Sequence, residues 1–486
     1  MNSKRKRIAS AILLMTMSTT IFNTNVFAGG GVSCISVECE GLFKGCCKGD
    51  DGDEHGKTPT TPSSITVNGS GNNVINGSGN NIIINQIQAP VSTKESTDEK
   101  EGHLVIGKEI ENKKIEDIAP IPKDEIKSVT IKNCVTYICE SAFEGCTDLT
   151  SVTIGNGVWS IGENAFSGCT ELTSITIPNS VTYIMNNAFS GCKGLTSITI
   201  PESVTKIGEC AFYDCTGLKE VKIPDSVTKI EDCAFYFCSG LTSINIPDSV
   251  TSIGERAFSG CTGLKEVKIP DSVTSIGKEA FQGCTGLKEV KIPDSVTEIG
   301  EMAFKGCTGL TSITIPDSVT EIGEMAFEGC TGLTSINVDK GNPNYKSIYG
   351  VLFLKDKTKL HTYPASKKAT NYTVPDSVTS IGWCAFAGCK GLTSIDIPNS
   401  VTSIGWCAFE GCTGLTSINI PDSVTYIGES AFAGCTGLKE VKIPDSVTEI
   451  DWSAFSGCTG LKEVTVPKSA KIADNTFDEN TTVHRI

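Results

Sequence analysis

Phenylalanine recurs along this chain every 23 residues, and this interval limits the possible folds more than any other feature. Nine members are equally spaced and four resume the count after a longer gap: Phe143, Phe166, Phe189, Phe212, Phe235, Phe258, Phe281, Phe304 and Phe327, then Phe386, Phe409, Phe432 and Phe455. A period in the twenties is typical of a solenoid, whose units bury their apolar sides only against their neighbours. Catalysis needs a nucleophile and a base in one unique geometry, so near-identical repetition favours an extended surface over an active site.

Within one unit, the apolar positions predict a short strand followed by turns. Leu310, Ile313 and Ile315 have the L-x-x-L-x-L spacing of a strand whose intervening residues point outward. Pro316 should end this strand because proline cannot donate to a central ladder. Phe327 then fills the core before the next strand begins, so about a third of each unit is expected to be core.

These residues form the pattern L-x-x-I-x-I-P-x-S-V-x-x-I-G-x-x-A-F-x-x-C, which resembles the BspA-like, treponemal-type leucine-rich repeat. The match runs from about residue 126 to the C-terminus. The resemblance implies a right-handed leucine-rich-repeat solenoid of about 14 coils, of the α/β type but mostly β with short turns and 3-10 segments. It also implies a secreted bacterial protein that acts in adhesion at a cell surface.

One coil is enlarged. Phe327 and Phe386 are 59 residues apart, which is 36 more than one period, and the extra residues lie at about 339–372. The segment "GVLFLKDKTKLHTYP", residues 350–364, predicts two strands around a Lys-Asp-Lys-Thr turn. We interpret it as an elaborated repeat that protrudes, with a packed irregular coil of no binding role as the alternative.

The N-terminal quarter of the chain divides into three segments. Residues 1–28 predict a secretory signal peptide, with a basic start, a short apolar run and a Val-Phe-Ala cleavage site. Residues 29–66 are cysteine-rich and acidic, residues 67–125 form an Asn/Gly-rich element, a linker and an N-terminal cap, and residues 126–486 form the solenoid. No apolar stretch is long enough to insert into a membrane.

Charge disfavours two classes of partner. The formal net charge is −15, and removal of the four signal-peptide cations leaves −19. Nucleic acid is therefore an unlikely ligand, because binding to its backbone needs clustered Lys and Arg. An anionic membrane surface is disfavoured for the same reason.

The spacing of most cysteines predicts buried core residues, and not catalytic or metal-binding ones. Thirteen of the 23 follow the periodic phenylalanine by three residues, as an in-register column. Parallel side chains in stacked coils keep their Cβ atoms too far apart for a bridge, so we expect buried free thiols. Bridging remains open for two further pairs one coil apart, Cys210 with Cys233 and Cys384 with Cys407. The better disulfide candidates, with three possible connectivities, are Cys34, Cys39, Cys46 and Cys47.

No residue pattern predicts catalysis, a metal or a cofactor. The four histidines, at positions 55, 103, 361 and 484, are widely spread, and no H-E-x-x-H, G-x-S-x-G or P-loop motif occurs. We therefore expect that the protein is not an enzyme.

Two sets of residues are candidates for binding. Outward strand positions on the concave sheet carry charged bands, for which a merely soluble surface is the alternative: Lys265, Glu266, Lys268, Lys288, Glu289 and Lys291. The position three residues before the periodic phenylalanine should face solvent, and after the enlarged coil it holds Trp383, Trp406 and Trp452, with Tyr426 nearby. Large rigid rings are typical of binding hot spots, although packing over the enlarged coil is an alternative.

We therefore expect a secreted or surface-associated binding protein that mediates adhesion to host or neighbouring-cell proteins or glycans, host extracellular matrix included. Its mechanism would be multivalent, with many weak equivalent contacts adding to avidity. The alternative is a structural spacer or self-assembling surface protein with no specific external ligand.

Overall fold

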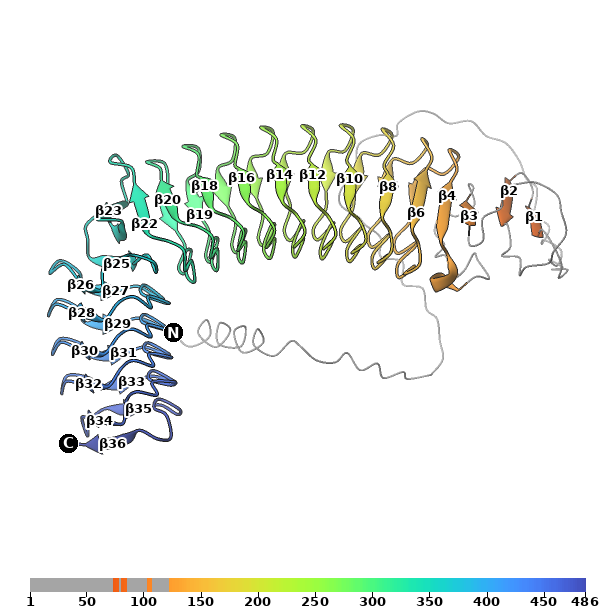
Figure 1. Ribbon diagram of the computed structural model, residues 1–486. Coiled ribbons are helices and arrows are strands. Elements are labelled where there is room, and N and C mark those ends of the chain that lie inside the picture. Colours follow the sequence, from red (N-terminus) through yellow and green to blue (C-terminus); the bar gives the residue numbers. More distant parts are fainter. Residues whose placement is uncertain (1–72, 78–79, 85–102, 107–121) are drawn as a thin grey trace, which may run out of the picture. The chain divides into compact units, whose positions relative to one another are not determined.

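The computed structural model describes residues 73–77, 80–84, 103–106 and 122–486, and most of these form a mostly-β solenoid (Figure 1). It has about 16 turns of about 23 residues, where the sequence predicts about 14. The difference arises because strands at both ends, β3 (His103–Ile106) and β36 (Thr482–Arg485), pair in parallel with their neighbours and extend the stack. In the described part, the single helix is the 3-10 turn η3 (Lys123–Glu125).

Each turn contributes a longer strand to one face, which we call the long-strand face. Besides β3 and β36 its strands are β4 (Ser128–Ile131), β6 (Ser151–Ile154), β8 (Ser174–Thr176), β10 (Ser197–Thr199), β12 (Glu220–Lys222), β14 (Ser243–Asn245), β16 (Glu266–Lys268), β18 (Glu289–Lys291), β20 (Ser312–Ile315), β22 (Ser335–Val338), β26 (Asn371–Thr373), β28 (Ser394–Asp396), β30 (Ser417–Asn419), β32 (Glu440–Lys442) and β34 (Glu463–Val466). They join into a nine-stranded sheet from β3 to β18, the pairs β20–β22 and β26–β28, and a four-stranded sheet from β30 to β36.

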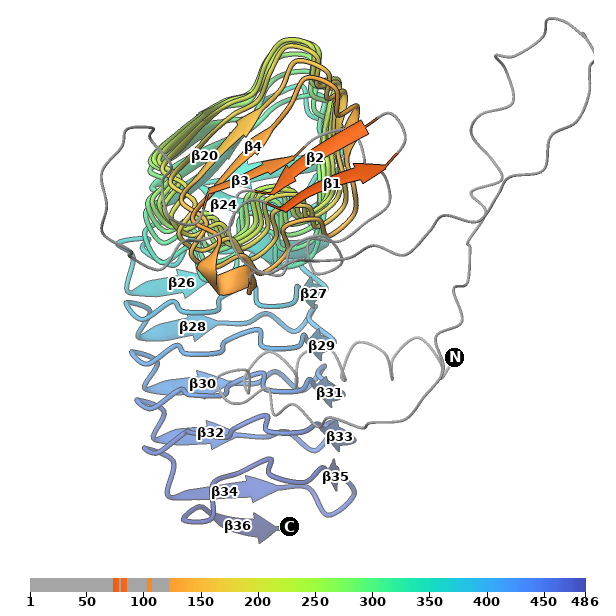
Figure 2. The ribbon, with the colours of Figure 1, turned by 90° about the vertical axis from the view of Figure 1, so that its right-hand side faces the viewer.

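A second face is built from two-residue strands. These are β5 (Tyr137–Ile138), β7 (Ser160–Ile161), β9 (Tyr183–Ile184), β11 (Lys206–Ile207), β13 (Lys229–Ile230), β15 (Ser252–Ile253), β17 (Ser275–Ile276), β19 (Glu298–Ile299), β21 (Glu321–Ile322), β27 (Ser380–Ile381), β29 (Ser403–Ile404), β31 (Tyr426–Ile427), β33 (Glu449–Ile450) and β35 (Lys471–Ile472). Figure 2 looks along the first coils and shows that their strands superimpose.

The repeat sets the pairing because equivalent residues of successive coils lie opposite each other. Val267 of β16 pairs with Val290 of β18, and both side chains are buried while the residues on either side are exposed. Strand side chains alternate between faces, so a shift of one residue would expose every core position. Within the coils the periodic phenylalanines stack, as Phe281 on Phe304 with ring centroids 5.4 Å apart and planes 5° from parallel.

A left-handed backbone position recurs two residues before each periodic phenylalanine. We call this series the left-handed column, because every member has φ between 49° and 59°: Ser141, Asn164, Asn187, Cys210, Cys233, Arg256, Glu279, Met302, Met325, Cys384, Cys407, Ser430, Ser453 and Asn475. The conformation directs the amide to the next coil, as where Arg256 N donates to the Lys278 carbonyl at 2.8 Å. A non-glycine residue in this region costs roughly 1–2 kcal/mol, which the coil-to-coil bonds offset.

The enlarged coil contains the predicted two strands. They are β24 (Val351–Leu354) and β25 (Lys359–Thr362), antiparallel around the turn, with β23 (Tyr345–Ile348) pairing on the other edge of β24. β25 then pairs in parallel with β27, so the insert continues the short-strand face. Tyr363, one period before Phe386, stacks on it at 5.0 Å and takes the place of a phenylalanine.

The expectation that this coil protrudes is wrong. Leu352 is buried in the hydrophobic cluster of the preceding coils, while Val351 and Phe353 are buried in the cluster of the following coils. Strand side chains point alternately to opposite sides, so β24 can connect two cores. The coil is packed, as in the alternative interpretation, and it contains regular paired strands.

Upstream, β1 (Asn73–Gly77) and β2 (Asn80–Ile84) pair as an antiparallel hairpin within the Asn/Gly-rich element. The predicted signal peptide and the cysteine-rich segment lie outside the described residues, as do the disulfide candidates Cys34, Cys39, Cys46 and Cys47. In the regions that the structure describes, no helix is long and apolar enough to span a bilayer.

Candidate functional site

The predicted charged bands lie on the long-strand face as two adjacent rows. Glu266 lies beside Glu289 and Lys268 beside Lys291, because β16 and β18 pair in parallel and in register. All four residues are exposed, as are Lys265 and Lys288 just before the strands. Alternate strand residues share a face, so an acidic row runs about 7 Å from a basic row. Like charges directly opposite each other are destabilising, and both rows contain such a pair.

An open hollow of about 810 Å³ lies over these rows. Its lining includes Glu266, Lys268, Glu289 and Lys291, together with the acidic residue Asp294. A second hollow of about 710 Å³ lies over β10, β12 and β14, and the two share Ser243. The long-strand face is therefore hollowed over several consecutive coils.

The lysines in the larger hollow have no ion-pair partner within the described part of the chain. Lys222, at the equivalent position in an earlier coil, pairs with Glu202 at 3.0 Å. Twenty residues before Lys268 and Lys291 the sequence holds Asp248 and Asp271, whose side chains are one methylene shorter. Lys268 and Lys291 are consequently exposed without an ion pair to these aspartates.

The predicted tryptophans divide into exposed and packed residues. Trp383 and Trp452 are 43% and 55% exposed. Trp406 is partly buried and faces solvent less than expected, because it packs against Met325, Cys384 and Cys407, where the coils on either side of the insert meet. Trp406 contacts Trp383 edge-to-face, with centroids 6.0 Å apart.

Polar groups surround these rings. The indole N–H of Trp406 is buried and lacks a hydrogen-bond acceptor among the described residues. Tyr426, on β31, donates its hydroxyl to Asp451 Oδ2 at 2.7 Å. Burial raises the pKa of the Glu429 carboxyl above its ordinary value, and the neighbouring charge of Asp451 raises it further. Tyr426 is thus linked to the tryptophan position through Asp451, which accepts its hydroxyl hydrogen bond and directly precedes Trp452.

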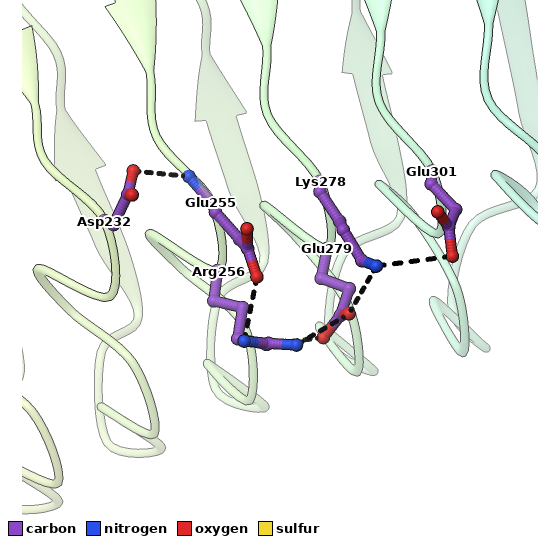
Figure 3. Close-up of polar contacts among 6 residues, drawn as sticks. All are labelled: Asp232, Glu255, Arg256, Lys278, Glu279 and Glu301. Atoms are coloured by element: carbon purple, nitrogen blue, oxygen red, sulfur yellow. Dashed lines mark hydrogen bonds and ion pairs between the residues drawn. The ribbon is translucent and has the colours of Figure 1, made fainter. Parts of the chain in front are cut away.

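In earlier coils the tryptophan position is ionic instead (Figure 3). Lys278 lies 3.4 Å from Glu301 in the next coil. Beside it, within the left-handed column, Arg256 binds Glu279 through two hydrogen bonds of 2.7 and 2.9 Å. The Glu279 side chain is only 4% exposed, so this pair is shielded from water on its acidic side.

An aromatic cluster escaped the sequence analysis. Tyr236 and Phe237 have ring centroids 4.3 Å apart, and Tyr213 contacts both rings. Phe237 is 45% exposed and has a φ of 59°, at a position where other coils have a left-handed glycine such as Gly260. The available signal was "FYFC" in place of the usual "FSGC", because a bulky residue in a glycine position is a conformational outlier.

The cysteine column is buried and unbridged, as predicted. From Cys169 onward these thiols also donate hydrogen bonds, as where Cys284 Sγ donates to the Phe258 carbonyl of the preceding coil at 3.2 Å. Burial raises the pKa of Cys284 to about 12, so this group stays a thiol at neutral pH. The extra pairs are also free cysteines, with Cys210 and Cys233 half-buried and Cys384 and Cys407 buried. No cluster of metal-ligating side chains occurs in the described ranges.

Comparison with known proteins identifies the repeat. The family model for the BspA type leucine rich repeat region, which spans six copies, matches residues 114–242, 228–361 and 359–484. No protein with a curated description matches the chain.

Two solved structures are similar to this one. A leucine rich cell surface protein from Faecalibacterium prausnitzii is 40% identical, with a TM-score of 0.54 over 60% of this chain and 87% of its own. A leucine-rich repeat protein from Bacteroides ovatus is 29% identical, with a TM-score of 0.50 over 86% of this chain and 98% of its own. The family match, together with the stacked 23-residue coils, places this chain in the BspA-type leucine-rich repeat family.

Proposed function

We propose that this protein is exported to the cell surface, where its long-strand face binds protein ligands and mediates adhesion to host or neighbouring cells. The observation that carries the proposal is the 810 Å³ hollow with its acidic and basic rows. The similarity to a Faecalibacterium protein described as a cell surface protein supports the location. The proposal assigns the chain no catalytic activity.

Electrostatics supports a ligand at this place. Glu266 faces Glu289 and Lys268 faces Lys291 across neighbouring strands, which disfavours the free protein. A partner with a basic row and an acidic row in the opposite arrangement would relieve both repulsions. Complementary rows fix the register of a complex and speed its formation more than they add raw affinity. Repetition along the solenoid would then add avidity.

The test is a binding screen of the mature protein against extracellular-matrix proteins and intact cells, at low and at physiological salt. The decisive variant is Lys268→Glu with Lys291→Glu, and the matched control is Lys390→Glu with Lys471→Glu, two exposed lysines outside the hollow and outside the strands of the long-strand face. We expect saturable binding that weakens at least tenfold in the first variant and is unchanged in the second.

Retained binding in the hollow variant would reject the long-strand face as the site. Failure to bind any ligand, with concentration-dependent assembly in sedimentation, would favour the structural alternative of a spacer or self-assembling surface protein. Circular dichroism of all variants confirms that the repeats are folded.

A further inference from the structure

A row of large side chains follows one edge of the solenoid after the enlarged coil. Trp383, Trp406, Glu429 and Trp452 occupy the same position in four successive coils. The backbone places them in sequence, because Cys384 N donates to the Trp406 carbonyl and Cys407 N to the Glu429 carbonyl, both at 2.9 Å. We call these four residues the tryptophan row.

The outer rings of the row are available to a ligand. Trp383 and Trp452 are exposed over about half their surface, while Trp406 is anchored beneath by the contacts described above and supports Trp383 edge-on. Three coil spacings separate the two exposed rings, about 14 Å. A ligand that contacts both rings must therefore be an extended chain.

The polar groups beside the rings are hydrogen-bond acceptors. Glu429 lies between two tryptophans in the row, and Asp451 precedes Trp452 and accepts its backbone N–H at 2.8 Å. Neither carboxylate forms an ion pair with Lys or Arg in the described part of the chain. The row thus combines apolar ring faces with carboxylate oxygens and holds no basic residue.

We infer that the tryptophan row is a binding site for a neutral oligosaccharide. Pyranose rings present apolar C–H faces that can stack on indole, and hydroxyl donors around their rims that can bind carboxylates. Sulfated and uronic-acid glycans are disfavoured because the row is acidic and the chain carries a net charge of −15. A protein partner would have to bury Glu429 and Asp451, which is costly unless it supplies a matching cation for each.

The site differs in place and in ligand class from the hollow of the long-strand face, so the two proposals can fail separately. The probes are hexamers of β-linked glucose and of N-acetylglucosamine, the corresponding monosaccharides, and a sulfated heparin oligosaccharide. Binding to the full mature chain is measured by isothermal titration calorimetry, and tryptophan fluorescence reports contact with the rings.

The variants are Trp383→Ala, Trp452→Ala and Glu429→Gln. Trp159→Ala is the matched control, because Trp159 is 47% exposed and lies on an earlier coil. We expect a neutral hexamer to bind more tightly than its monomer, with roughly tenfold loss in each tryptophan variant and none in the control. The Lys268→Glu, Lys291→Glu variant should bind the hexamer like the wild type.

Three results would overturn the inference. They are the absence of binding to both neutral hexamers at millimolar concentration, an affinity in the Trp383→Ala and Trp452→Ala variants that equals that of the wild type, and preference for the sulfated oligosaccharide. Thermal unfolding of each variant separates loss of the site from loss of the fold, since both exposed rings can be removed without emptying the core.

Discussion

Regular coils and the enlarged coil use different side chains to bind the backbone carbonyls of the preceding coil. In regular coils a serine hydroxyl donates to a valine carbonyl of the preceding coil, as Ser295 to Val273 and Ser318 to Val296, both at 2.7 Å. In the enlarged coil the buried amide of Asn342 donates instead, to the carbonyls of Val319 at 2.9 Å and Pro316 at 2.7 Å.

The same asparagine also accepts two bonds. Its Oδ1 receives the backbone N–H of Asn344 at 2.9 Å and of Tyr345 at 2.7 Å. Regular coils thus distribute stability over many weak, equivalent bonds, whereas the enlarged coil concentrates several on one side chain. A single change should consequently matter most where the repeat is interrupted.

The largest effect is expected for Asn342→Ala. The change removes four hydrogen bonds and leaves the Val319 carbonyl and the backbone amides of Asn344 and Tyr345 without these partners. The Pro316 carbonyl still accepts the Val319 N–H at 3.3 Å. The free energy of unfolding should fall by about 3 kcal/mol. Ser295→Ala, which removes one such bond, should cost about 1 kcal/mol. Urea unfolding measures both, and equal losses would contradict the distinction between the two regions.

The next largest effect concerns the Arg256–Glu279 ion pair, which tests whether the stability of a regular coil can also depend on a single contact. Arg256→Ala leaves the buried Glu279 without its bidentate partner and should cost about 3 kcal/mol, as does breaking other buried pairs. The double variant Arg256→Met, Glu279→Met copies the Met302 and Met325 arrangement two coils later and should be nearly neutral. A double variant as unstable as Arg256→Ala would show that the ion pair is indispensable there.

A pH effect should arise at the enlarged coil. His361 is buried, with Nδ1 2.8 Å from Thr362 Oγ1 and Nε2 3.4 Å from the Ile322 carbonyl, and it faces Glu324 and Lys359. Burial lowers the pKa of His361 below its ordinary value, so the unfolded chain takes up a proton near pH 6.5 that the folded chain does not.

Stability should therefore fall as the pH drops below about 6.5, by up to about 1.4 kcal/mol per pH unit. Chemical denaturation from pH 7.5 to 5.5, compared with His361→Gln, isolates this contribution from those of other groups. Parallel curves for the two proteins would reject the assignment.

The smallest effect concerns the left-handed column. Ser430→Gly relieves an unfavourable φ of 54° at the cost of greater freedom in the unfolded chain, for a net gain of about 0.5 kcal/mol. Ser403→Gly, on strand β29, should lower the free energy of unfolding by about 0.5 kcal/mol, because the backbone there is extended and glycine only adds freedom to the unfolded chain. A loss in both variants would mean that the column carries no conformational strain.

Most of the regular coils could be predicted from residue spacing. The phenylalanine period, the strand positions and the buried cysteine column are confirmed, because each depends on contacts between equivalent residues one coil apart. The antiparallel strands of the insert are also as predicted. The phenylalanine period alone does not predict Tyr363 as the member of the stack before Phe386, because a different aromatic residue occupies the position one period upstream.

The candidate sites were predicted less completely. The charge rows follow from register, so Glu266 beside Glu289 and Lys268 beside Lys291 could be derived. The lack of an ion-pair partner for Lys268 could not be derived from register, because it depends on how far the Asp248 side chain reaches. Trp406 was expected at the surface because its position faces solvent in regular coils, and the insert changes what lies beside it.

The amino-acid sequence by itself determined the coil, its core and the order of residues on each face, because a 23-residue period brings identical positions together whatever the wider arrangement. Only the tertiary structure decided how the insert joins the two sets of coils. Its contacts join residues with no periodic relation, as Lys359 to Glu324, 35 residues apart, and His361 to Ile322, 39 residues apart. Such pairs are selected by packing in three dimensions, which spacing along the chain does not encode.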